Sequence, residues 1–527
     1  MSGDLRVLVA EKIAPAGVEY LSERFSVDER LGLDAAGVAE IIADYDAIVV
    51  RSATKVTADL IAAAPRLKVV GRAGTGVDNV DVEAATRRGI IVCNAAGSNS
   101  LSAAEHAIAL MLAQARNIAQ AHDALVDGRW DRSKYSGIEI TGKTLGVLGF
   151  GRIGQLVAER AKGLGMNVVA FDPFVTDSRY RELGVERAGS ADDLYAVSDF
   201  VSVHLASTPE TRGSINAAVF AKMKPGARLI NAARGDIVDT DDLVAAIQSG
   251  HLGGAGIDVF AQEPTTESPL FGLPGVVVTP HLGASTSEAQ DRAGVVVAEQ
   301  VAAALTGGVV TSAVNIPAVG PEALAVLGPF LPLATQLGKL VAALVDGVAS
   351  PLEINYEGHL ADLDTRLLTS AVLTGALEGH VEDPVNVVNA GSLAAERGIT
   401  WTETSTPQSR DYTNRLTVAA GGVDVGGTTV GTTSRPRLVQ VFGQEIDIEL
   451  SPHLGIFRYT DVPGQIGRVG TLLGESKVNI ASAAVSRSED AGAAVMVVAV
   501  DSPVSDETVA RIAALEGFED ARFVSLA

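Results

Sequence analysis

The most constraining feature of the sequence is a glycine pattern that lies between an apolar strand and a helix. Gly149, Gly151 and Gly154 have the spacing G-x-G-x-x-G after the apolar run Leu145–Leu148, and the amphipathic segment Gln155–Gly163 follows. In this context the first glycine allows a tight turn, the second lets the backbone approach a pyrophosphate, and the third lets helix pack on strand. The pattern predicts a dinucleotide-binding βαβ unit whose helix N-terminus holds the pyrophosphate. The alternative is that the glycines serve helix packing alone.

An acidic residue closes the second predicted strand of the same unit. The apolar run Val168–Phe171 ends at Asp172. A carboxylate at this position can accept hydrogen bonds from both hydroxyls of the adenosine ribose, and it repels a 2′-phosphate. The sequence therefore predicts NAD rather than NADP as the cofactor.

Short apolar strands alternate with helical segments on both sides of the glycine motif. This alternation predicts two α/β units with parallel sheets, the second of them doubly wound. After Pro317 the strict alternation of strands and helices ends. Predicted helices and strands surround the Gly/Thr-rich stretch 421–434, which is interpreted as hairpin turns or a mobile loop. From Leu454 the predicted order βαββαβ is typical of a ferredoxin-like unit.

Composition narrows the classes of function. The 527 residues include 41 Lys and Arg against 64 Asp and Glu, which gives a formal charge of −23 and argues against nucleic-acid binding. The single cysteine, Cys93, excludes a disulfide framework and a cysteine-based metal cluster, and no metal site is expected. The sequence has neither a membrane-spanning apolar stretch nor the charge order of a signal peptide, so we expect a cytoplasmic protein without a membrane partner.

Three polar residues follow three successive strands of the predicted dinucleotide-binding unit. Arg234, Glu263 and His281 come after the runs 228–231, 255–260 and 276–279. Ligands bind at the carboxyl ends of parallel strands. A carboxylate there can orient an imidazole and raise its proton affinity, while a guanidinium forks onto a substrate carboxylate. Of the other histidines, His204 also follows a strand, whereas His106 lies within a predicted helix and is interpreted as a packing residue.

The segments Gly149–Gly154, Asn231–Asp236, Asp258–Pro264 and Thr279–Thr286 together resemble the D-isomer-specific 2-hydroxyacid dehydrogenases. Within that family the chain is similar to the long-type D-3-phosphoglycerate dehydrogenases. The resemblance implies NAD-dependent oxidation of D-3-phosphoglycerate to 3-phosphohydroxypyruvate, the first committed step of L-serine biosynthesis. It makes His281 the acid/base, Glu263 the residue that tunes it, and Arg234 the residue that binds and polarises the 2-oxo acid.

The glycine motif and the resemblance also assign residues to the cofactor and to the substrate. The expected cofactor-binding residues are Gly149, Gly151, Arg152, Ile153, Gly154, Asp172, Thr208, Ala232, Ala233, Asp258, His281 and Gly283. The expected substrate-binding residues are Arg51, Ser52, Gly74, Gly76 and Asn99, with Arg132 and Lys134 reaching the neighbouring subunit's site. The alternative for the basic segment 128–134 is a solvated turn.

The resemblance implies four domains and a regulatory C-terminus. Residues 1–98 with 284–317 are expected to form a substrate-binding domain, 99–283 an NAD-binding Rossmann domain, 318–452 an α+β intervening domain and 453–527 an ACT domain. ACT domains pair side by side and bind amino acids, so Tyr459, Asp461 and Asn479 are expected to bind L-serine as a feedback inhibitor. The expected assembly is a homo-oligomer, a dimer of dimers.

Two other functions stay open. The same catalytic residues would serve another D-2-hydroxyacid dehydrogenase, one that reduces hydroxypyruvate, glyoxylate or 2-oxoglutarate. The fold has also been recruited as an NAD-sensing corepressor, a binding protein that retains these residues.

Overall fold

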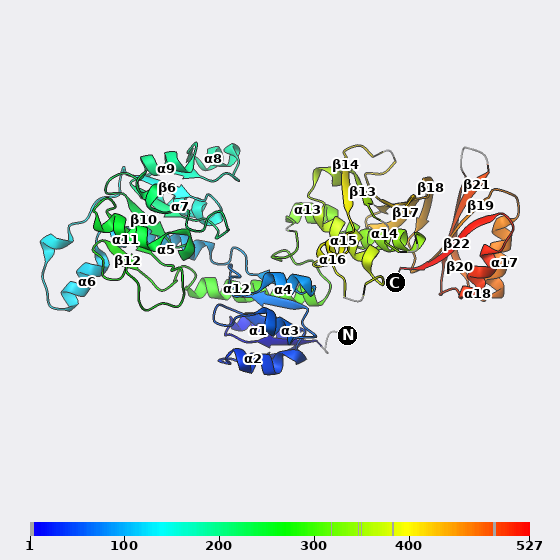
Figure 1. Ribbon diagram of the computed structural model, residues 1–527, viewed down its shortest axis with the longest axis horizontal. Helices are drawn as coiled ribbons and strands as arrows, with labels where there is room; N and C mark the ends of the chain where they lie inside the picture. The colour runs from blue at the N-terminus through cyan, green and yellow to red at the C-terminus, as the bar shows by residue number, and fades with distance from the viewer. Residues whose placement is uncertain are drawn as a thin grey trace.

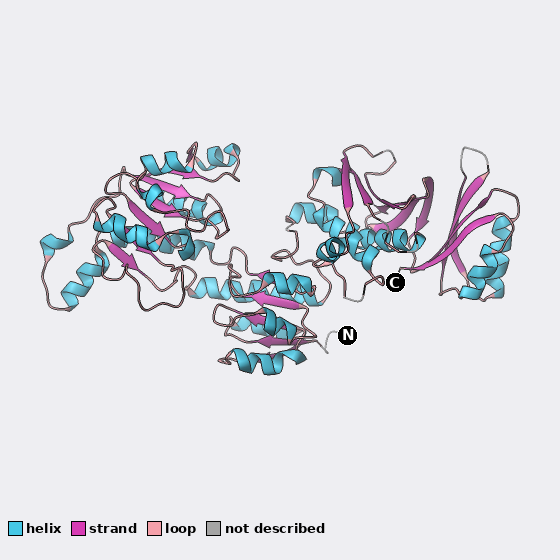
Figure 2. Cartoon of the chain, viewed as in Figure 1, coloured by secondary structure: helices cyan, strands magenta, loops and turns pink. Residues whose placement is uncertain are grey.

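Four β-sheets follow one another along the chain in the computed structural model, each with its own helices (Figure 1, Figure 2). The structure describes residues 5–317, 319–345, 347–348, 350–381, 384–409, 411–487 and 492–526. Within them the first two sheets are parallel, the third is mixed and the fourth is antiparallel. The predicted fold class is confirmed: two Rossmann-like units, an α+β unit and a ferredoxin-like unit.

The first sheet has the strand order β2-β1-β3-β4-β5. Its elements are β1 (Arg6–Val9), α1 (Pro15–Ser22), β2 (Ser26–Glu29), α2 (Ala35–Ile41), η1 (Ile42–Asp44), β3 (Ala47–Val50), α3 (Ala58–Ala62), β4 (Val69–Arg72), α4 (Val82–Arg87) and β5 (Ile91–Asn94). The chain returns to this unit after the second sheet, because α12 (Ser287–Leu305) places Val297 and Val301 in the same core as Val7 and Val69 (Figure 1). The first unit is therefore built from two separate stretches of chain.

The second sheet has the order β12-β11-β10-β9-β6-β7-β8. Its strands are β6 (Thr144–Leu148), β7 (Asn167–Phe171), β8 (Glu186–Arg187), β9 (Phe200–Val203), β10 (Arg228–Asn231), β11 (Gly254–Ile257) and β12 (Val276–Val278). The helices are α5 (Ser100–Ala115), α6 (Ile118–Val126), η2 (Arg132–Tyr135), α7 (Arg152–Gly163), α8 (Asp177–Leu183), α9 (Ala191–Val197), α10 (Ala217–Phe220), η3 (Gly235–Ile237) and α11 (Thr240–Gln248). Strand β6 lies between β7 and β9, so the strand order reverses at the carboxyl end of β6, where such sheets bind ligands.

The third sheet has the order β14-β13-β15-β16-β17-β18. The unit contains α13 (Pro321–Leu327), α14 (Phe330–Leu344), β13 (Leu352–Gly358), η4 (His359–Asp362), α15 (Arg366–Leu377), α16 (Ala390–Glu396), β14 (Trp401–Thr406), β15 (Asn414–Ala420), β16 (Val423–Val430), β17 (Arg435–Val441) and β18 (Gln444–Glu449). The interpretation of 421–434 as turns or a mobile loop was wrong for its centre, which is β16. This strand is rich in glycine because α14 lies on it: a Cβ at Gly427 would come within 2.6 Å of Leu333 Cδ1.

The fourth sheet has the order β20-β21-β19-β22. It follows the predicted βαββαβ sequence as β19 (His453–Thr460), α17 (Gln465–Glu475), β20 (Ile480–Arg487), β21 (Ala493–Val500), α18 (Asp506–Ala513) and β22 (Phe518–Ser525). Buried Leu454, Ile456 and Val497 of this sheet belong to the same hydrophobic cluster as Leu416 and Leu438 of the third unit. The two C-terminal units thus share one core. Among the residues that the structure describes, no helix is both long and apolar enough to cross a bilayer.

Candidate functional site

The glycine turn after β6 has the geometry that a pyrophosphate site requires. Gly149 has a φ of +91°, and a Cβ there would lie 2.7 Å from the carbonyl of His204. A Cβ at Gly154 would lie 2.2 Å from Gly149 O, so α7 begins in close contact with the turn. By contrast, nothing lies within 4 Å of a Cβ built on Gly151. Gly151 therefore leaves the start of α7, with Arg152 and Ile153 in its first turn, open to a ligand.

Asp172 holds the same turn from the end of β7. Its Oδ2 accepts a hydrogen bond from Phe150 N at 2.9 Å, and its Oδ1 accepts one from Phe174 N at 2.9 Å. Each carboxylate oxygen can accept a further hydrogen bond. The carboxylate is thereby fixed beside the glycine turn in a position suited to two ribose hydroxyls.

His281 and Glu263 form a close pair beyond the ends of β12 and β11. His281 Nδ1 lies 2.5 Å from Glu263 Oε2, and Glu263 Oε1 accepts a hydrogen bond from Phe260 N at 2.9 Å. The hydrogen bond to Glu263 raises the pKa of His281, although burial acts in the opposite direction. Burial raises the pKa of Glu263, but the hydrogen bonds from His281 and Phe260 N outweigh it, so that this pKa is lowered. The pair consists of an ionised carboxylate and an imidazole whose Nε2 remains available.

Arg234 lies at the exit of β10 and faces the first unit. Its Nη1 donates a hydrogen bond to Ala233 O at 2.7 Å, and its Nη2 lies 3.4 Å from Asp78 Oδ2. A Cβ built on Gly76 would lie 2.5 Å from Arg234 Nη2, so the guanidinium rests directly on this loop. Its positive charge also acts on His281, whose pKa it lowers slightly against the larger effect of Glu263. The structure therefore brings Arg234, Glu263 and His281 into one region.

Arg72 of the first unit lies within electrostatic range of both Arg234 and Arg51. Burial lowers the pKa of the Arg72 guanidinium, and the charges of Asp78, Arg234 and Arg51 also act on this group. Arg72 Nε is buried without a hydrogen-bond partner among the described residues. The sequence reasoning missed Arg72, which ends β4 two residues before Gly74. In a protein of net charge −23, these arginines concentrate positive charge locally.

The substrate loops of the first unit are held by side chains that the sequence reasoning also missed. Glu11 accepts hydrogen bonds from Arg51 N and Thr54 N, both at 2.8 Å, which shapes the loop that carries Ser52. Thr75 Oγ1 donates to Asn99 Oδ1 at 2.7 Å and so joins the Gly74–Gly76 loop to the residue before α5. The first two contacts fix the loop of Arg51 and Ser52, and the third joins Gly74 and Gly76 to Asn99.

The remaining cofactor candidates lie around the same strand ends. Asn231 shapes the loop of Ala232 and Ala233, since its Oδ1 accepts from Ala233 N at 3.0 Å. Thr208 follows β9 and is held by a hydrogen bond from its amide to Thr211 Oγ1 at 2.8 Å. Asp258 is fully buried, and its Oδ2 accepts from Gly283 N at 2.9 Å. Asp258 thus supports the loop of His281 instead of presenting its carboxylate to solvent.

Two other histidines, His204 and His106, lie near this region. His204 Nε2 lies 2.8 Å from Ser202 Oγ, and burial lowers the pKa of His204 to about 4. This histidine supports the glycine turn and stays neutral near pH 7. His106, interpreted from the sequence as a satisfied packing residue, has a polar partner in the site region: its Nε2 lies 3.1 Å from Asp258 Oδ1. Its helix-interior position gave no signal of this contact.

The basic arm with Arg132 and Lys134 lies apart from this cluster. Both residues are in the exposed element η2, and the arm with α6 extends at the opposite side of the second unit from α1–α4 (Figure 1). Trp130, on the same arm, is 80% exposed. Within the described part of one chain, no polar contact joins the arm to the residues around His281. A role of these residues in a neighbouring subunit's site stays a prediction.

The three expected effector residues do not lie together in one chain. Tyr459 and Asp461 lie at the end of the fourth sheet where Thr460 pairs with Ala493, whereas Asn479 precedes Ile480, which pairs with Val500 at the opposite end. Tyr459 is buried, with its ring stacked on Phe518 at a centroid distance of 5.3 Å. Asp461 Oδ2 pairs with Arg487 Nε at 3.2 Å, and Asn479 N donates to Asp501 Oδ1 at 3.3 Å. The ring of Tyr459 is thus part of the core, whereas the Asp461 and Asn479 segments lie at the surface.

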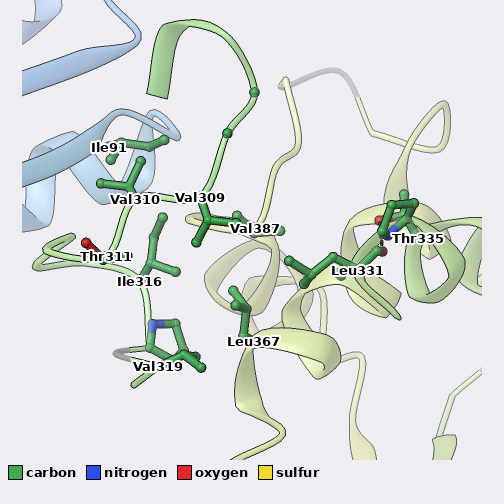
Figure 3. A pocket seen from close by; sticks show the side chains of 15 residues that line it. Ile91, Val309, Val310, Thr311, Ile316, Val319, Leu331, Thr335, Leu367 and Val387 are labelled. Carbon is green, nitrogen blue, oxygen red and sulfur yellow. Dashed lines mark hydrogen bonds between the residues drawn. The ribbon is translucent and has the colours of Figure 1, made fainter. Parts of the chain in front are cut away.

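A separate cavity of about 270 Å³ lies between the first and third units (Figure 3). Its walls come from β5, the segments 307–311 and 316–317, α14 and α15, with Val319 and Val387, and they include Ile91, Val310, Ile316, Leu331 and Leu367. None of its described lining residues carries an ionisable side chain. The cavity belongs to the joint between the units and not to the polar cluster around His281.

Comparison with known proteins gives matches along most of the chain. Residues 108–283 match the D-isomer specific 2-hydroxyacid dehydrogenase NAD binding domain, residues 326–442 the D-3-phosphoglycerate dehydrogenase intervening domain, and residues 454–517 the ACT domain. A D-3-phosphoglycerate dehydrogenase of Mycobacterium leprae is 46% identical over 96% of this chain and 97% of its own. One from Synechocystis is 42% identical over 99% of this chain and 95% of its own. Among solved structures, a glyoxylate reductase from Paecilomyes thermophila is 31% identical, with a TM-score of 0.55, over 61% of this chain and 99% of its own.

Proposed function

Because the chain belongs to the D-isomer-specific 2-hydroxyacid dehydrogenases, and among them to the D-3-phosphoglycerate dehydrogenases, we propose that it oxidises D-3-phosphoglycerate to 3-phosphohydroxypyruvate with NAD. The observation that carries this proposal is the His281–Glu263 pair at 2.5 Å, with the Arg234 guanidinium nearby. An acid–base pair beside a cationic group provides what a 2-hydroxy acid needs for oxidation at its hydroxyl carbon.

The roles of the three residues follow from their atoms. With Nδ1 bonded to Glu263, neutral His281 can accept the hydroxyl proton of the substrate at Nε2. Glu263 then stabilises the imidazolium that forms. Arg234 can fork onto the substrate carboxylate and the reacting oxygen, which fixes the substrate and polarises the carbonyl in the reverse reaction.

The residues around the glycine turn fit NAD. The open space over Gly151 and the start of α7 suit a pyrophosphate, and the Asp172 carboxylate suits an unphosphorylated ribose. Thr208, Ala232, Ala233 and Gly283 would line the path toward His281. Bound NAD would accept the hydride. The residues of this chain would bind and orient the substrate and move its hydroxyl proton.

The arginines of the first unit support a phosphorylated substrate. The charges of Arg51 and Arg234 both act on Arg72, whose buried Nε has an unused hydrogen atom. Ser52, Gly74, Gly76 and Asn99 would contact the remaining polar groups of the substrate. We also assign Arg132 and Lys134 to the phosphate in a neighbouring subunit's site, in a homo-oligomer built as a dimer of dimers.

Arg132→Ala is expected to raise KM for D-3-phosphoglycerate about 10-fold or more with little change in kcat. A hydrogen bond to a charged group contributes roughly 1.5–3 kcal/mol to binding. Steady-state kinetics checks this. Arg129→Ala is the matched control, since Arg129 lies on the same arm in an ion pair with Asp127 at 3.1 Å. An unchanged KM in Arg132→Ala would remove this residue from the site.

The substrate is tested by following NADH formation with a panel of D-2-hydroxy acids. We expect D-3-phosphoglycerate to give the highest kcat/KM. A preference for unphosphorylated D-2-hydroxy acids, or for 2-hydroxyglutarate, would favour the alternative dehydrogenases. NAD binding without turnover of any of these acids would favour a corepressor-type binding protein.

We further propose that the fourth unit binds L-serine and inhibits the enzyme. Calorimetry is expected to detect serine binding, and Asn479→Ala should weaken both binding and inhibition while basal kcat is kept. Such inhibition requires serine to bind one conformation better than another. An activity that stays flat across serine concentrations, together with no heat of binding, would exclude the proposal.

The sheets and the family matches support the four domain limits: 1–98 with 284–317, 99–283, 318–452 and 453–527. Residue 318, at one of these limits, lies outside the described residues. Limited proteolysis tests these limits, because cleavage is expected in the segments that join the domains.

A further inference from the structure

Asp258 is the anchor of the loop that carries His281. It is fully buried, and its Oδ1 accepts hydrogen bonds from Thr279 Oγ1 at 2.6 Å and Leu282 N at 2.7 Å, while its Oδ2 accepts one from Gly283 N at 2.9 Å. Its backbone oxygen accepts a hydrogen bond from His281 N at 2.8 Å. All these donors lie between positions 279 and 283. Asp258 therefore holds the loop that carries His281 at several points.

The loop needs such an anchor because His281 has a left-handed backbone. Its φ is +55°, a region that residues other than glycine seldom occupy. Backbone in this region is kept only when surrounding contacts determine it. The hydrogen bonds to Asp258 supply those contacts.

One further donor to this anchor comes from a different element, the helix α5. His106 Nε2 lies 3.1 Å from Asp258 Oδ1 and 3.0 Å from Thr279 Oγ1. An ionised carboxylate only accepts hydrogen bonds, so the Nε2 of His106 carries the hydrogen. Burial raises the pKa of Asp258, and the hydrogen bonds from His106, Thr279 and Leu282 outweigh it, so that the pKa is lowered. Asp258 is therefore ionised at neutral pH, and His106 is one of its partners.

The same helix is also joined to the substrate loops. It starts directly after Asn99, whose Oδ1 accepts from Thr75 Oγ1 at 2.7 Å. Ser102 Oγ lies 2.7 Å from Thr286 Oγ1, which caps α12 on the other side of the His281 loop. Helix α5 thus begins next to a substrate loop, and its side chains also contact the residues that hold the loop of His281.

We propose that His106 is a positioning residue for the reaction: by sharing its single Nε2 hydrogen between Asp258 Oδ1 and Thr279 Oγ1, it fixes the loop 279–283 so that His281 Nε2 meets the substrate hydroxyl. The inference rests on the proposed function. His106 itself touches neither substrate nor cofactor and acts through Asp258. Displacement of a catalytic group by about 1 Å can lower the rate on the order of 100-fold.

The test compares two substitutions of His106 in the full-length protein. His106→Phe keeps a ring and removes the donor, whereas His106→Gln can place an amide N–H close to the position of Nε2. We expect His106→Phe to lower kcat about 10- to 100-fold with KM for D-3-phosphoglycerate within about 3-fold. We also expect its primary deuterium isotope effect on kcat, measured with substrate deuterated at C2, to rise. His106→Gln should recover most of kcat.

The matched control is His251→Phe. His251 lies in the same unit, and its Nε2 bonds to a backbone oxygen, Phe220 O, at 2.8 Å. This variant should lower the thermal midpoint and leave kcat and the isotope effect unchanged. A wild-type kcat in His106→Phe, or a loss that folded His106→Gln does not recover, would overturn the positioning role alone. Wild-type protein that oxidises no D-2-hydroxy acid would overturn the proposed function, and this inference with it.

Discussion

His281→Asn is expected to lower kcat for D-3-phosphoglycerate oxidation by about 10²- to 10⁴-fold, the range for loss of a general base. The reason is that no other described side chain offers a free imidazole nitrogen beside Glu263 and Arg234. Asparagine is chosen because it tolerates the φ of +55° at this position better than most residues. The loss should therefore reflect the missing proton acceptor and not a collapsed loop.

Stopped-flow measurement of NADH formation checks this result, and NAD binding by fluorescence titration is the control. We expect the variant to bind NAD within about 3-fold of the wild type, because the glycine turn and Asp172 are unchanged. A variant that keeps more than a tenth of the wild-type kcat would show that the proton leaves by another route.

Arg234→Lys is expected to lower kcat/KM by about 10²- to 10³-fold, as found when a donor that stabilises the reacting oxygen is removed. Lysine keeps the positive charge but has no planar fork for a carboxylate. It also loses the contact with Ala233 O at 2.7 Å, which fixes the direction of the side chain. We expect kcat and KM to be affected together, because Arg234 would both bind the substrate and polarise its carbonyl.

Arg212→Lys is the matched control for this variant. Arg212 lies in the same unit and pairs with Asp236 at 3.1 Å, but its side chain is largely exposed. Its replacement should leave kcat/KM within about 2-fold. If both substitutions had equally small effects, Arg234 would not contact the substrate.

Much of the first two sheets was predictable because their inner strands are buried on both faces. Runs such as 145–148 and 200–203 are apolar throughout, as expected for strands of a parallel sheet covered by helices. The strands β2 and β8 were missed because they are short, largely exposed edge strands without an apolar run. Strand β16 was missed because its Gly/Thr composition is typical of loops. The close approach of Leu333 explains Gly427, while a Cβ on Gly426 would lie 3.0 Å from Gln440 Cβ.

The site was predictable where a residue leaves a strand at its carboxyl end. Arg234, Glu263 and His281 follow this rule, since chain order alone places them at one edge of the sheet. Arg72 and His106 were nevertheless missed: Arg72 is the last residue of β4, and His106 lies in the middle of α5, where the rule gives no signal. Their contacts depend on how two elements far apart in sequence pack together. A single sequence carries no signal of that packing.

The pH dependence of kcat/KM for D-3-phosphoglycerate, in wild type and Glu263→Gln, tests the central claim most directly. Oxidation requires neutral His281, so activity should fall as the pH drops through a pKa that Glu263 holds above the ordinary 6.5. Removing the carboxylate charge lowers that pKa. The variant should therefore have a lower maximal rate, with its acid limb moved to lower pH. Superimposable acid limbs would contradict the assignment of His281 and Glu263 as the proton-transfer pair.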